Sequence, residues 1–295
     1  MKLAILLMIH NNLQQVKMLI NTLSYPNITI FVHADKKMDL NQADLDIPGV
    51  ILLPEEKRVN VKWGTISMVD ATLNMMEYAM KYGYYDYYWL CSGQDFPLVK
   101  ANEIVLFFKD KTSNFIEFWK SYNYGLGKKN NLDKRCEIWC PNWVIGSKLH
   151  LRILKRLYIE ITGGYFHTWH IFKRKNFPVK DFYFGATWWC LNRDVVLWMV
   201  KYLAKHWEYR DFYKNSICPD ESFFHTLIKI SPYADNVESY LHYIDWSQGG
   251  NHPKILTCRD YQLMKESGKL MARKFDINVD AKVLDMIQNN SSKNE

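Results

Sequence analysis

The sequence has no apolar run approaching the roughly 20 residues that a helix needs to cross a bilayer. The apolar stretch near its start, 3–9, is short and lacks a cleavage site of small residues, so it predicts a strand and not a signal peptide. We therefore expect a cytoplasmic protein, whose closest approach to lipid is peripheral contact at the inner face of a membrane.

Several common catalytic and nucleotide-binding signatures are also missing. The sequence contains neither the glycine-rich dinucleotide fingerprint nor the phosphate-loop Gly-Lys-Ser/Thr motif. It also lacks the Gly-x-Ser-x-Gly elbow and the His-Glu-x-x-His pair of zinc peptidases. These absences exclude several large enzyme classes.

Patterns that bind metal or nucleic acid are weak. Cys136 and Cys140 are not followed by a second ligand pair, so the six cysteines are expected to be buried free thiols and not a zinc site. The formal charge is +7, but the basic runs 128–129 and 173–175 are short and separate, which argues against a nucleic-acid partner. The charge suits a diphosphate ligand or an anionic membrane surface, or it forms a basic face with no partner.

Aromatic residues are abundant, at 15% of the chain with 11 Trp and 19 Tyr. A sugar has an apolar C–H face that packs on aromatic rings, so this composition is compatible with a carbohydrate site. A core rich in Trp and Tyr explains the composition as well.

Apolar runs alternate with amphipathic segments along the chain. Runs of the kind found in strands buried on both faces are separated by segments with helical spacing. This order predicts an α/β fold with a mostly parallel central sheet flanked by helices. The expected strands span 3–9, 28–32, 50–53, 87–91, 182–189 and 240–244, and the expected helices span 13–23, 66–82, 194–206, 219–228, 260–266 and 281–288.

We expect a single domain over 1–295, because no internal repeat and no linker of distinct composition interrupts the chain. Two parts are expected within it, at about 1–110 and at about 111–288. The stretch at about 120–180 has weak periodicity and predicts functional loops of an acceptor cleft. The polar tail 289–295 is expected to fray.

Polar segments follow three of the expected strands. These are His10, the segment 33–35 and the segment 92–95. Because parallel sheets place ligands at the carboxyl ends of their strands, we expect these segments to share one edge of the sheet.

Three acids are candidates for chemistry, each with a structural alternative. Glu221 can act as a base if it faces a cleft, or it is an ordinary acid at a helix start. Asp95 binds a donor sugar or fixes the loop that does so, or it only caps a turn. Asp35 accepts hydrogen bonds from a nucleobase or ribose, or it is a turn acid paired with Lys36 or Lys37.

A late basic group and one Trp are further candidates. Lys254, Arg259, Arg273 and Lys274 can neutralise a diphosphate as a metal ion does elsewhere, or they are solvated surface charges. Trp246 can stack on a sugar ring, or it is a core residue at a strand end.

Taken together, the segments resemble glycosyltransferase family 14, which holds the Core-2/I-branching β-1,6-N-acetylglucosaminyltransferases and the peptide xylosyltransferases. The resemblance runs from about His10 to Asp280 and follows the order of the family. The segments that carry it are His10 with 32–35, then 61–71, 90–98, 184–188, 219–221, 243–246 with 252–254, and 272–276.

The resemblance implies a GT-A type fold, inversion at the anomeric carbon, a UDP-sugar donor and no metal ion or other cofactor. It makes about 1–110 the nucleotide-binding part and about 111–288 the acceptor-binding and catalytic part. It makes Glu221 the catalytic base and Lys274 a diphosphate ligand, with Lys254 as the second cation and Arg259 as its competitor. The other implied nucleotide-sugar contacts are Met8, His10, Asp35, Trp63, Gly93, Gln94, Asp95 and Arg273, and the implied acceptor contacts are Glu117, Asp220, Tyr243, Asp245 and Trp246.

The chain departs from the Golgi members of this family. It shows no amino-terminal anchor, no stem and no disulfide framework, which implies a bacterial relative that builds surface glycans on a glycan or lipid-linked acceptor. The main alternative is a non-catalytic carbohydrate-binding protein on the same fold, which would lack the base or the cations.

Overall fold

A 7-stranded sheet forms the centre of the computed structural model, which describes residues 1–123, 133–142, 145, 149–161, 174, 176–249 and 252–292. Its strands, in spatial order, are β10 (Val237–Glu238), β6 (Asn114–Phe115), β9 (Cys190–Asn192), β4 (Tyr87–Ser92), β1 (Leu3–Ile9), β2 (Ile28–Ala34) and β3 (Val50–Leu52). The run from β4 to β3 is parallel, whereas β9 is antiparallel to both β4 and β6. The expected α/β fold with a mostly parallel sheet is confirmed.

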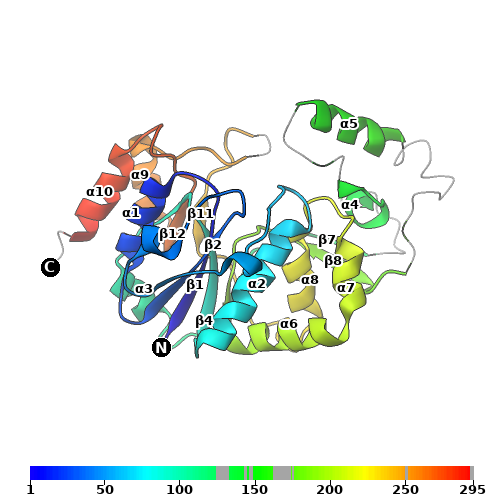
Figure 1. The fold of residues 1–295 in the computed structure, drawn as a ribbon, viewed down its shortest axis with the longest axis horizontal. Helices are drawn as coiled ribbons and strands as arrows, with labels where there is room; N and C mark the ends of the chain where they lie inside the picture. Colours follow the sequence, from blue (N-terminus) through cyan, green and yellow to red (C-terminus); the bar gives the residue numbers. More distant parts are fainter. Residues whose placement is uncertain are drawn as a thin grey trace.

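Helices cover both faces of this sheet. Successive side chains of β1 point to opposite faces, and they enter two different cores. Leu3, Ile5 and Leu7 belong to one core cluster, and Ala4 and Leu6 to the other. The first cluster includes residues of α1 (Leu13–Leu23), α3 (Ala101–Phe107), α9 (Tyr261–Glu266) and α10 (Lys282–Ser292), and the second includes residues of α2 (Ser67–Tyr82), α6 (Arg193–Lys205), α7 (Trp207–Tyr213) and α8 (Phe223–Ile230) (Figure 1).

A 3-stranded sheet continues from the carboxyl end of β4. It consists of β11 (His242–Ile244), β12 (Met271–Arg273) and β5 (Asp95–Pro97), in that order. β5 follows β4 after a tight turn, and its antiparallel register places Asp95 opposite Arg273. The late strand β12 is thereby brought to the edge of the central sheet at which β4 ends.

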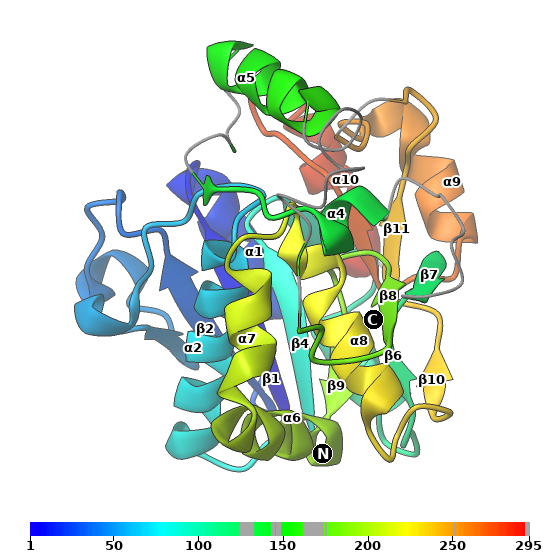
Figure 2. The ribbon, with the colours of Figure 1, turned by 90° about the vertical axis from the view of Figure 1, so that its right-hand side faces the viewer.

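The remaining elements lie in or near the middle of the sequence. Figure 2 shows β7 (Lys120–Asn123) beside β8 (Asp181–Phe184), with α4 (Asp133–Glu137) and α5 (Leu149–Glu160) above them. Short 3₁₀ turns complete the fold at Gln42–Leu45, Glu55–Lys57, Pro219–Glu221 and Cys258–Asp260.

Four sequence expectations need correction. Of the expected strand 182–189, only the part up to Phe184 is strand, as β8, and β9 begins after it at Cys190. The strand ends before Gly185, whose backbone passes so close to Glu117 that a Cβ would lie 1.7 Å from the Glu117 carbonyl oxygen. The expected helix 219–228 is a 3₁₀ turn followed by α8, with a break at Ser222. The expected helix 281–288 continues to Ser292, and the middle region contains α4 and α5. Fraying of the tail stays a prediction, and 293–295 lie outside the described residues.

Two further expectations were tested by the fold. All six cysteines are free, and all but Cys258 are buried, as predicted. Every helix in the described ranges is too short or too polar to span a bilayer.

Candidate active site

The three polar segments that follow β1, β2 and β4 share one edge of the sheet, as predicted. The parallel register pairs Met8 with both His33 and Ser92, so the strands end side by side. The Asp35 N–H donates to the Ile9 carbonyl at 2.9 Å, which fixes the two chain exits next to each other. His10 is exposed at this edge, yet enough protein surrounds it that desolvation, together with Arg273, lowers its pKa.

Asp35 is buried at this edge and already has partners. One carboxylate oxygen accepts from the Lys37 N–H at 3.0 Å, and the other lies 3.3 Å from the Lys37 ammonium. The pairing with Lys37 that the sequence left open is therefore present, and the contact with uridine stays a prediction. Nearby, Trp63 is 41% exposed, while Met8 is partly buried and its sulfur accepts from the Thr72 hydroxyl at 3.8 Å.

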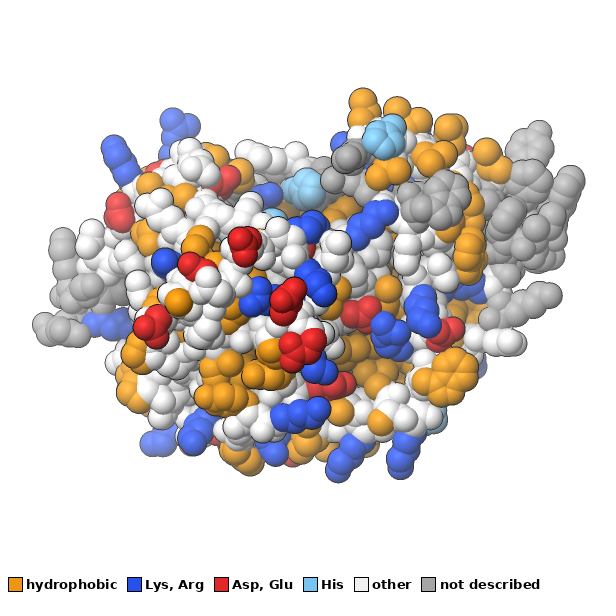
Figure 3. Space-filling view, viewed as in Figure 1, with side chains coloured by type: hydrophobic (Ala, Val, Ile, Leu, Met, Phe, Trp, Pro, Cys, Tyr) orange, Lys and Arg blue, Asp and Glu red, His pale blue; other side chains and the backbone are white. Residues whose placement is uncertain are grey.

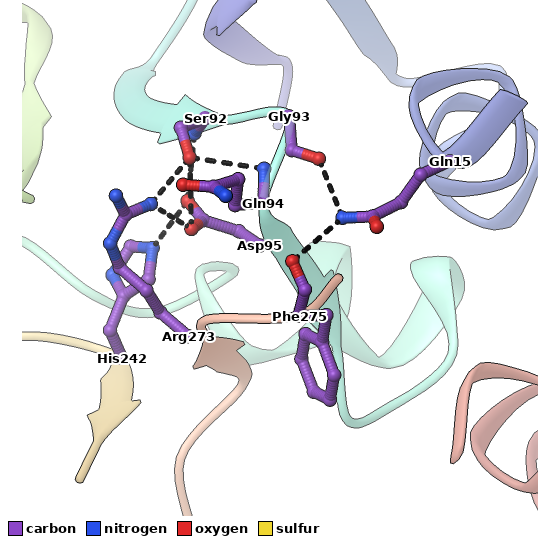
Figure 4. A network of polar contacts seen from close by, with 8 residues as sticks. All are labelled: Gln15, Ser92, Gly93, Gln94, Asp95, His242, Arg273 and Phe275. Carbon is purple, nitrogen blue, oxygen red and sulfur yellow. Dashed lines mark hydrogen bonds and ion pairs between the residues drawn. The ribbon is translucent and has the colours of Figure 1, made fainter. Parts of the chain in front are cut away.

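Asp95 is fully buried and anchors Arg273 (Figure 4). One oxygen of its carboxylate lies 2.5 Å from the guanidinium, and the other accepts from the Ser92 N–H at 2.7 Å and lies 3.4 Å from His242 Nε2. Burial opposes ionisation of Asp95, but Arg273, His242 and the Ser92 N–H outweigh it and hold its pKa below the usual range. Of the two functional roles expected for Asp95, the structure favours fixing the loop over touching the donor.

Cys91, Asp95 and His242 place three possible ligand atoms within 4.8 Å of one another. In this structure Asp95 is paired with Arg273 and lies beside His242, and burial raises the pKa of the Cys91 thiol well above its usual value.

Gln15, which the sequence analysis did not single out, ties the 92–95 turn to the end of β12. Its amide donates to the carbonyls of Gly93 at 2.9 Å and Phe275 at 3.2 Å, and its oxygen accepts from the Ile277 N–H. The Phe275 N–H in turn donates to the Gln94 carbonyl at 2.8 Å. Gly93 is required here because a Cβ would lie 2.8 Å from a methyl group of Val16. Gly93 and Gln94 thus shape the site through their backbones.

Lys274 lies between these two anchors. Arg273 before it is held by Asp95, Phe275 after it is held by Gln15 and Gln94, and the Lys274 carbonyl accepts from the Leu256 N–H at 2.9 Å. Within the described residues no carboxylate pairs with the Lys274 ammonium, and its pKa is lowered by desolvation and by Arg273. A partly buried cation beside a second cation is suited to bind an anion.

The other late residues have different surroundings. Lys254 pairs with Asp260 at 2.5 Å and lies 3.7 Å from Asp245, so its charge is already matched, whereas Arg259 is exposed. Trp246 is 44% exposed, which rules out the core alternative. Tyr243 is half-buried against the first core cluster, and Asp245 also accepts from the Ser247 N–H at 2.7 Å.

Glu221 closes the 3₁₀ turn that begins at Pro219. Its carboxylate pairs with Arg135 of α4, and its side chain keeps 27% of its surface exposed. Arg135 was not identified from the sequence, since it lies in the middle region where periodicity is weak. The same region was expected to supply acceptor contacts, and Arg135 places one cation there, against the proposed base.

The segment from Phe184 to Trp188 connects Glu221 to the cations. The Gly185 N–H donates to the Glu221 carbonyl at 2.9 Å, the Thr187 hydroxyl donates to Asp220 at 2.8 Å, and the Trp188 ring lies 4.0 Å from the Arg273 guanidinium carbon. Because Gly185 and Trp188 are three residues apart, their Cα atoms lie within roughly 11 Å. This short segment therefore links the backbone of the Glu221 turn to the guanidinium of Arg273, and Lys274 follows Arg273 in the chain.

Asp220, which precedes Glu221, is buried, and its expected contact with an acceptor stays a prediction. Thr187 donates to one of its oxygens, while the other has no partner among the described residues. Desolvation, and then the charge of Glu221, raise its pKa to about 6. The buried native carboxyl thus holds its proton over a pH range in which an unfolded Asp has lost it.

This raised pKa predicts a pH-dependent effect of Asp220→Asn on stability. From about pH 4 to about pH 6 the native state binds the extra proton, so wild-type stability falls as pH rises through that window. Relative to wild type, the Asn variant should gain up to roughly 3 kcal/mol between pH 4 and pH 8, measured by denaturant unfolding at both pH values. A difference that stays constant with pH would contradict the raised pKa.

Glu117 approaches the same turn through its backbone. Its carbonyl lies against Gly185, whereas its carboxylate accepts from the Ser239 hydroxyl at 2.8 Å. Its expected contact with an acceptor stays a prediction.

The buried anchor of Arg273 predicts a large loss of stability on Asp95→Asn. The change leaves a buried guanidinium without its counter-charge, which should cost about 3–5 kcal/mol in the free energy of unfolding. Asp211→Asn is the matched control, because Asp211 pairs with Lys214 where both side chains are about half exposed, and its loss should cost at most about 1 kcal/mol. Equal losses in the two variants, measured by denaturant unfolding, would contradict the anchoring role.

The comparison with protein families agrees with this site. The model of the Core-2/I-branching enzyme family matches residues 3–266.

The chain belongs to the Core-2/I-branching enzyme family.

The matched span contains the turn of Glu221 and Lys254, and Arg273 and Lys274 follow it shortly.

Curated relatives within this Core-2/I-branching group are distant in sequence. The chain is 23% identical to xylosyltransferase 2 of Canis lupus familiaris over 97% of this chain and 33% of that protein. It is 26% identical to a β-glucuronosyltransferase of Arabidopsis thaliana over 93% of this chain and 62% of that protein. The chain therefore spans about a third of the length of the xylosyltransferases that it matches.

Proposed function

We propose that the chain is an inverting glycosyltransferase that transfers a sugar from a UDP-sugar to a hydroxyl of a glycan acceptor without a metal ion. The observation that carries this proposal is the segment from Phe184 to Trp188, which holds a carboxylate turn at one end and contacts Arg273 at the other. Transfer with inversion needs these two functions in one place, a base for the acceptor and positive charge for the leaving group.

In the proposed reaction, Glu221 removes the proton of the acceptor hydroxyl as its oxygen attacks the anomeric carbon. The bond from that carbon to the diphosphate breaks, its electron pair leaves with UDP, and an α-linked donor gives a β-linked product. Arg273 and Lys274 stabilise the charge that develops on the diphosphate. Lys254 is paired with Asp260 and Arg273 with Asp95, so both are candidates for the second cation.

The donor and the acceptor are the open parts of this function. The xylosyltransferase and glucuronosyltransferase relatives favour xylose or glucuronic acid as the sugar, and the resemblance to the branching enzymes favours N-acetylglucosamine. The proposed acceptor is a glycan or lipid-linked glycan of bacterial surface polysaccharide synthesis. The proposed location is the cytoplasm.

A panel of UDP-sugars tests the proposed function. UDP release should be stimulated by acceptor sugars for at least one donor, and this activity should persist in excess EDTA. Loss of activity in EDTA that manganese restores would overturn the metal-free reaction. Sugar binding without turnover of any donor would favour the non-catalytic carbohydrate-binding alternative.

A further inference from the structure

Helix α5 presents an apolar stripe to solvent. Leu149, Ile153, Leu157 and Ile161 follow one another at four-residue spacing, so they share one face, and they are 71%, 52%, 54% and 47% exposed. Leu154 widens this face and is 38% exposed. These residues form what we call the outer stripe. Figure 3 shows hydrophobic side chains gathered at the upper right, where Figure 1 places α5.

The opposite face of α5 attaches the helix to the protein. Tyr158 and Ile159 pack against a small core of Cys140, Ile145, Ile217 and Cys218. The Tyr158 hydroxyl donates to the Trp139 carbonyl at 2.6 Å, and the Lys155 ammonium lies 6.0 Å from the centre of the Trp63 ring. The outer stripe is therefore not the surface by which α5 packs on its own domain.

Charge distinguishes the possible occupants of the outer stripe. Arg152 and Arg156 are exposed one turn apart beside it, and the span from Leu149 to Ile161 carries three basic residues against the single acid Glu160. An apolar stripe with a basic flank is typical of helices that lie in the interface of an anionic bilayer. A second copy of the chain packed on the same stripe would bring like charges together.

We propose that the outer stripe docks the protein onto an anionic lipid surface, with the stripe in the headgroup region and Arg152 and Arg156 on lipid phosphates. Two contacts connect the inner face of α5 to the proposed site. The Lys155 ammonium lies over the Trp63 ring, and the small core beneath α5 includes Cys218, which directly precedes the turn of Glu221. Docking would hold the acceptor side of the site near lipid. This step rests on the proposed function, and it assigns a lipid-linked glycan as the acceptor class.

Sedimentation with vesicles tests the docking without any donor. The full chain should pellet with vesicles of phosphatidylcholine and phosphatidylglycerol, much less with phosphatidylcholine alone, and less as salt increases. Ile153→Ser combined with Leu157→Ser should weaken partitioning by about tenfold or more. The control is Leu106→Ser with Leu263→Ser, two residues 67% and 56% exposed on α3 and α9, and it should partition like wild type.

The basic flank has its own matched pair of variants. Arg152→Gln with Arg156→Gln should weaken binding to anionic vesicles about 30-fold, since each basic residue near such a surface contributes about fivefold. Lys201→Gln with Lys205→Gln removes the same charge from an exposed turn of α6, at the other end of the molecule in Figure 1, and should have no effect. Glu160→Gln should strengthen binding.

Three results would overturn the docking. Wild type could remain in the supernatant with anionic vesicles at low salt, or the stripe variant could pellet like wild type. Self-association without lipid that Ile153→Ser with Leu157→Ser abolishes would assign the stripe to a second copy instead. If the chain bound vesicles but transferred no sugar, the proposed function would be wrong and the docking would stand. If the chain transferred sugar but did not bind vesicles, the docking would be wrong and the proposed function would stand.

Discussion

Replacing Glu221 by glutamine should lower sugar transfer by about 10²–10⁴-fold while leaving UDP binding unchanged. Glutamine keeps the size of the side chain and its hydrogen-bond acceptor, but it cannot take the proton of the acceptor hydroxyl. The segment that holds this turn donates to the Glu221 backbone carbonyl, so the substitution leaves the turn in place. Steady-state UDP release with acceptor, together with calorimetric UDP binding, measures both parts.

The control for this variant is Glu208→Gln. Glu208 stands in the first turn of α7, is about half exposed and pairs with His206, so it represents an acid that only stabilises a helix start. Its replacement should leave transfer unchanged. Near-normal turnover in the Glu221 variant would mean that another group, or water, is the base.

Replacing Lys274 by methionine should lower turnover by about 10²–10³-fold, as for other groups that stabilise charge in a transition state. It should also weaken UDP binding by about tenfold or more, because a hydrogen bond to a charged group contributes about 1.5–3 kcal/mol. Uridine lacks the diphosphate, so its affinity should not change. This contrast between UDP and uridine separates loss of the diphosphate contact from general damage to the site.

The matched control is Lys265→Met on the exposed surface of α9, which should leave UDP binding and turnover as in wild type. If the Lys274 variant lost uridine and UDP affinity equally, Lys274 would be shaping the nucleoside pocket and not binding phosphate.

The parallel part of the fold was predictable from sequence because its signal is local. In β1, successive residues enter two different cores, which gives the continuous apolar run of a strand buried on both faces. The register of such strands then follows from parallel pairing, so the gathering of His10, Asp35 and Ser92 at one edge was also predictable.

The misses have non-local causes. The break of the strand at Gly185 depends on the Glu117 backbone, far away in the sequence. Helix α5 has a regular repeat at 149, 153, 157 and 161, and that spacing was the available signal, but the loop-like composition around it concealed the helix.

The site residues also divide into those with a local sequence signal and those whose role depends on non-local contacts. Glu221 and Lys274 stood out by residue type and order, whereas the positions of Gln15, Arg135 and His242 become meaningful only in three dimensions. Gln15 bridges to Phe275 across the length of the chain, and no periodicity reports such a contact. Likewise the burial of Asp95 and Asp220, which changes their roles, follows from tertiary packing.

A crystal structure of the chain with UDP bound tests the central claim most directly. The proposed site predicts the diphosphate within hydrogen-bonding distance of the Lys274 ammonium and beside Arg273, the uracil or ribose at the carboxyl ends of β1 and β2 near Asp35, and no metal ion between the phosphates and a carboxylate. UDP bound away from β12, or a cation bridging its phosphates to Asp35 or Glu221, would contradict this site and the metal-free transfer that depends on it.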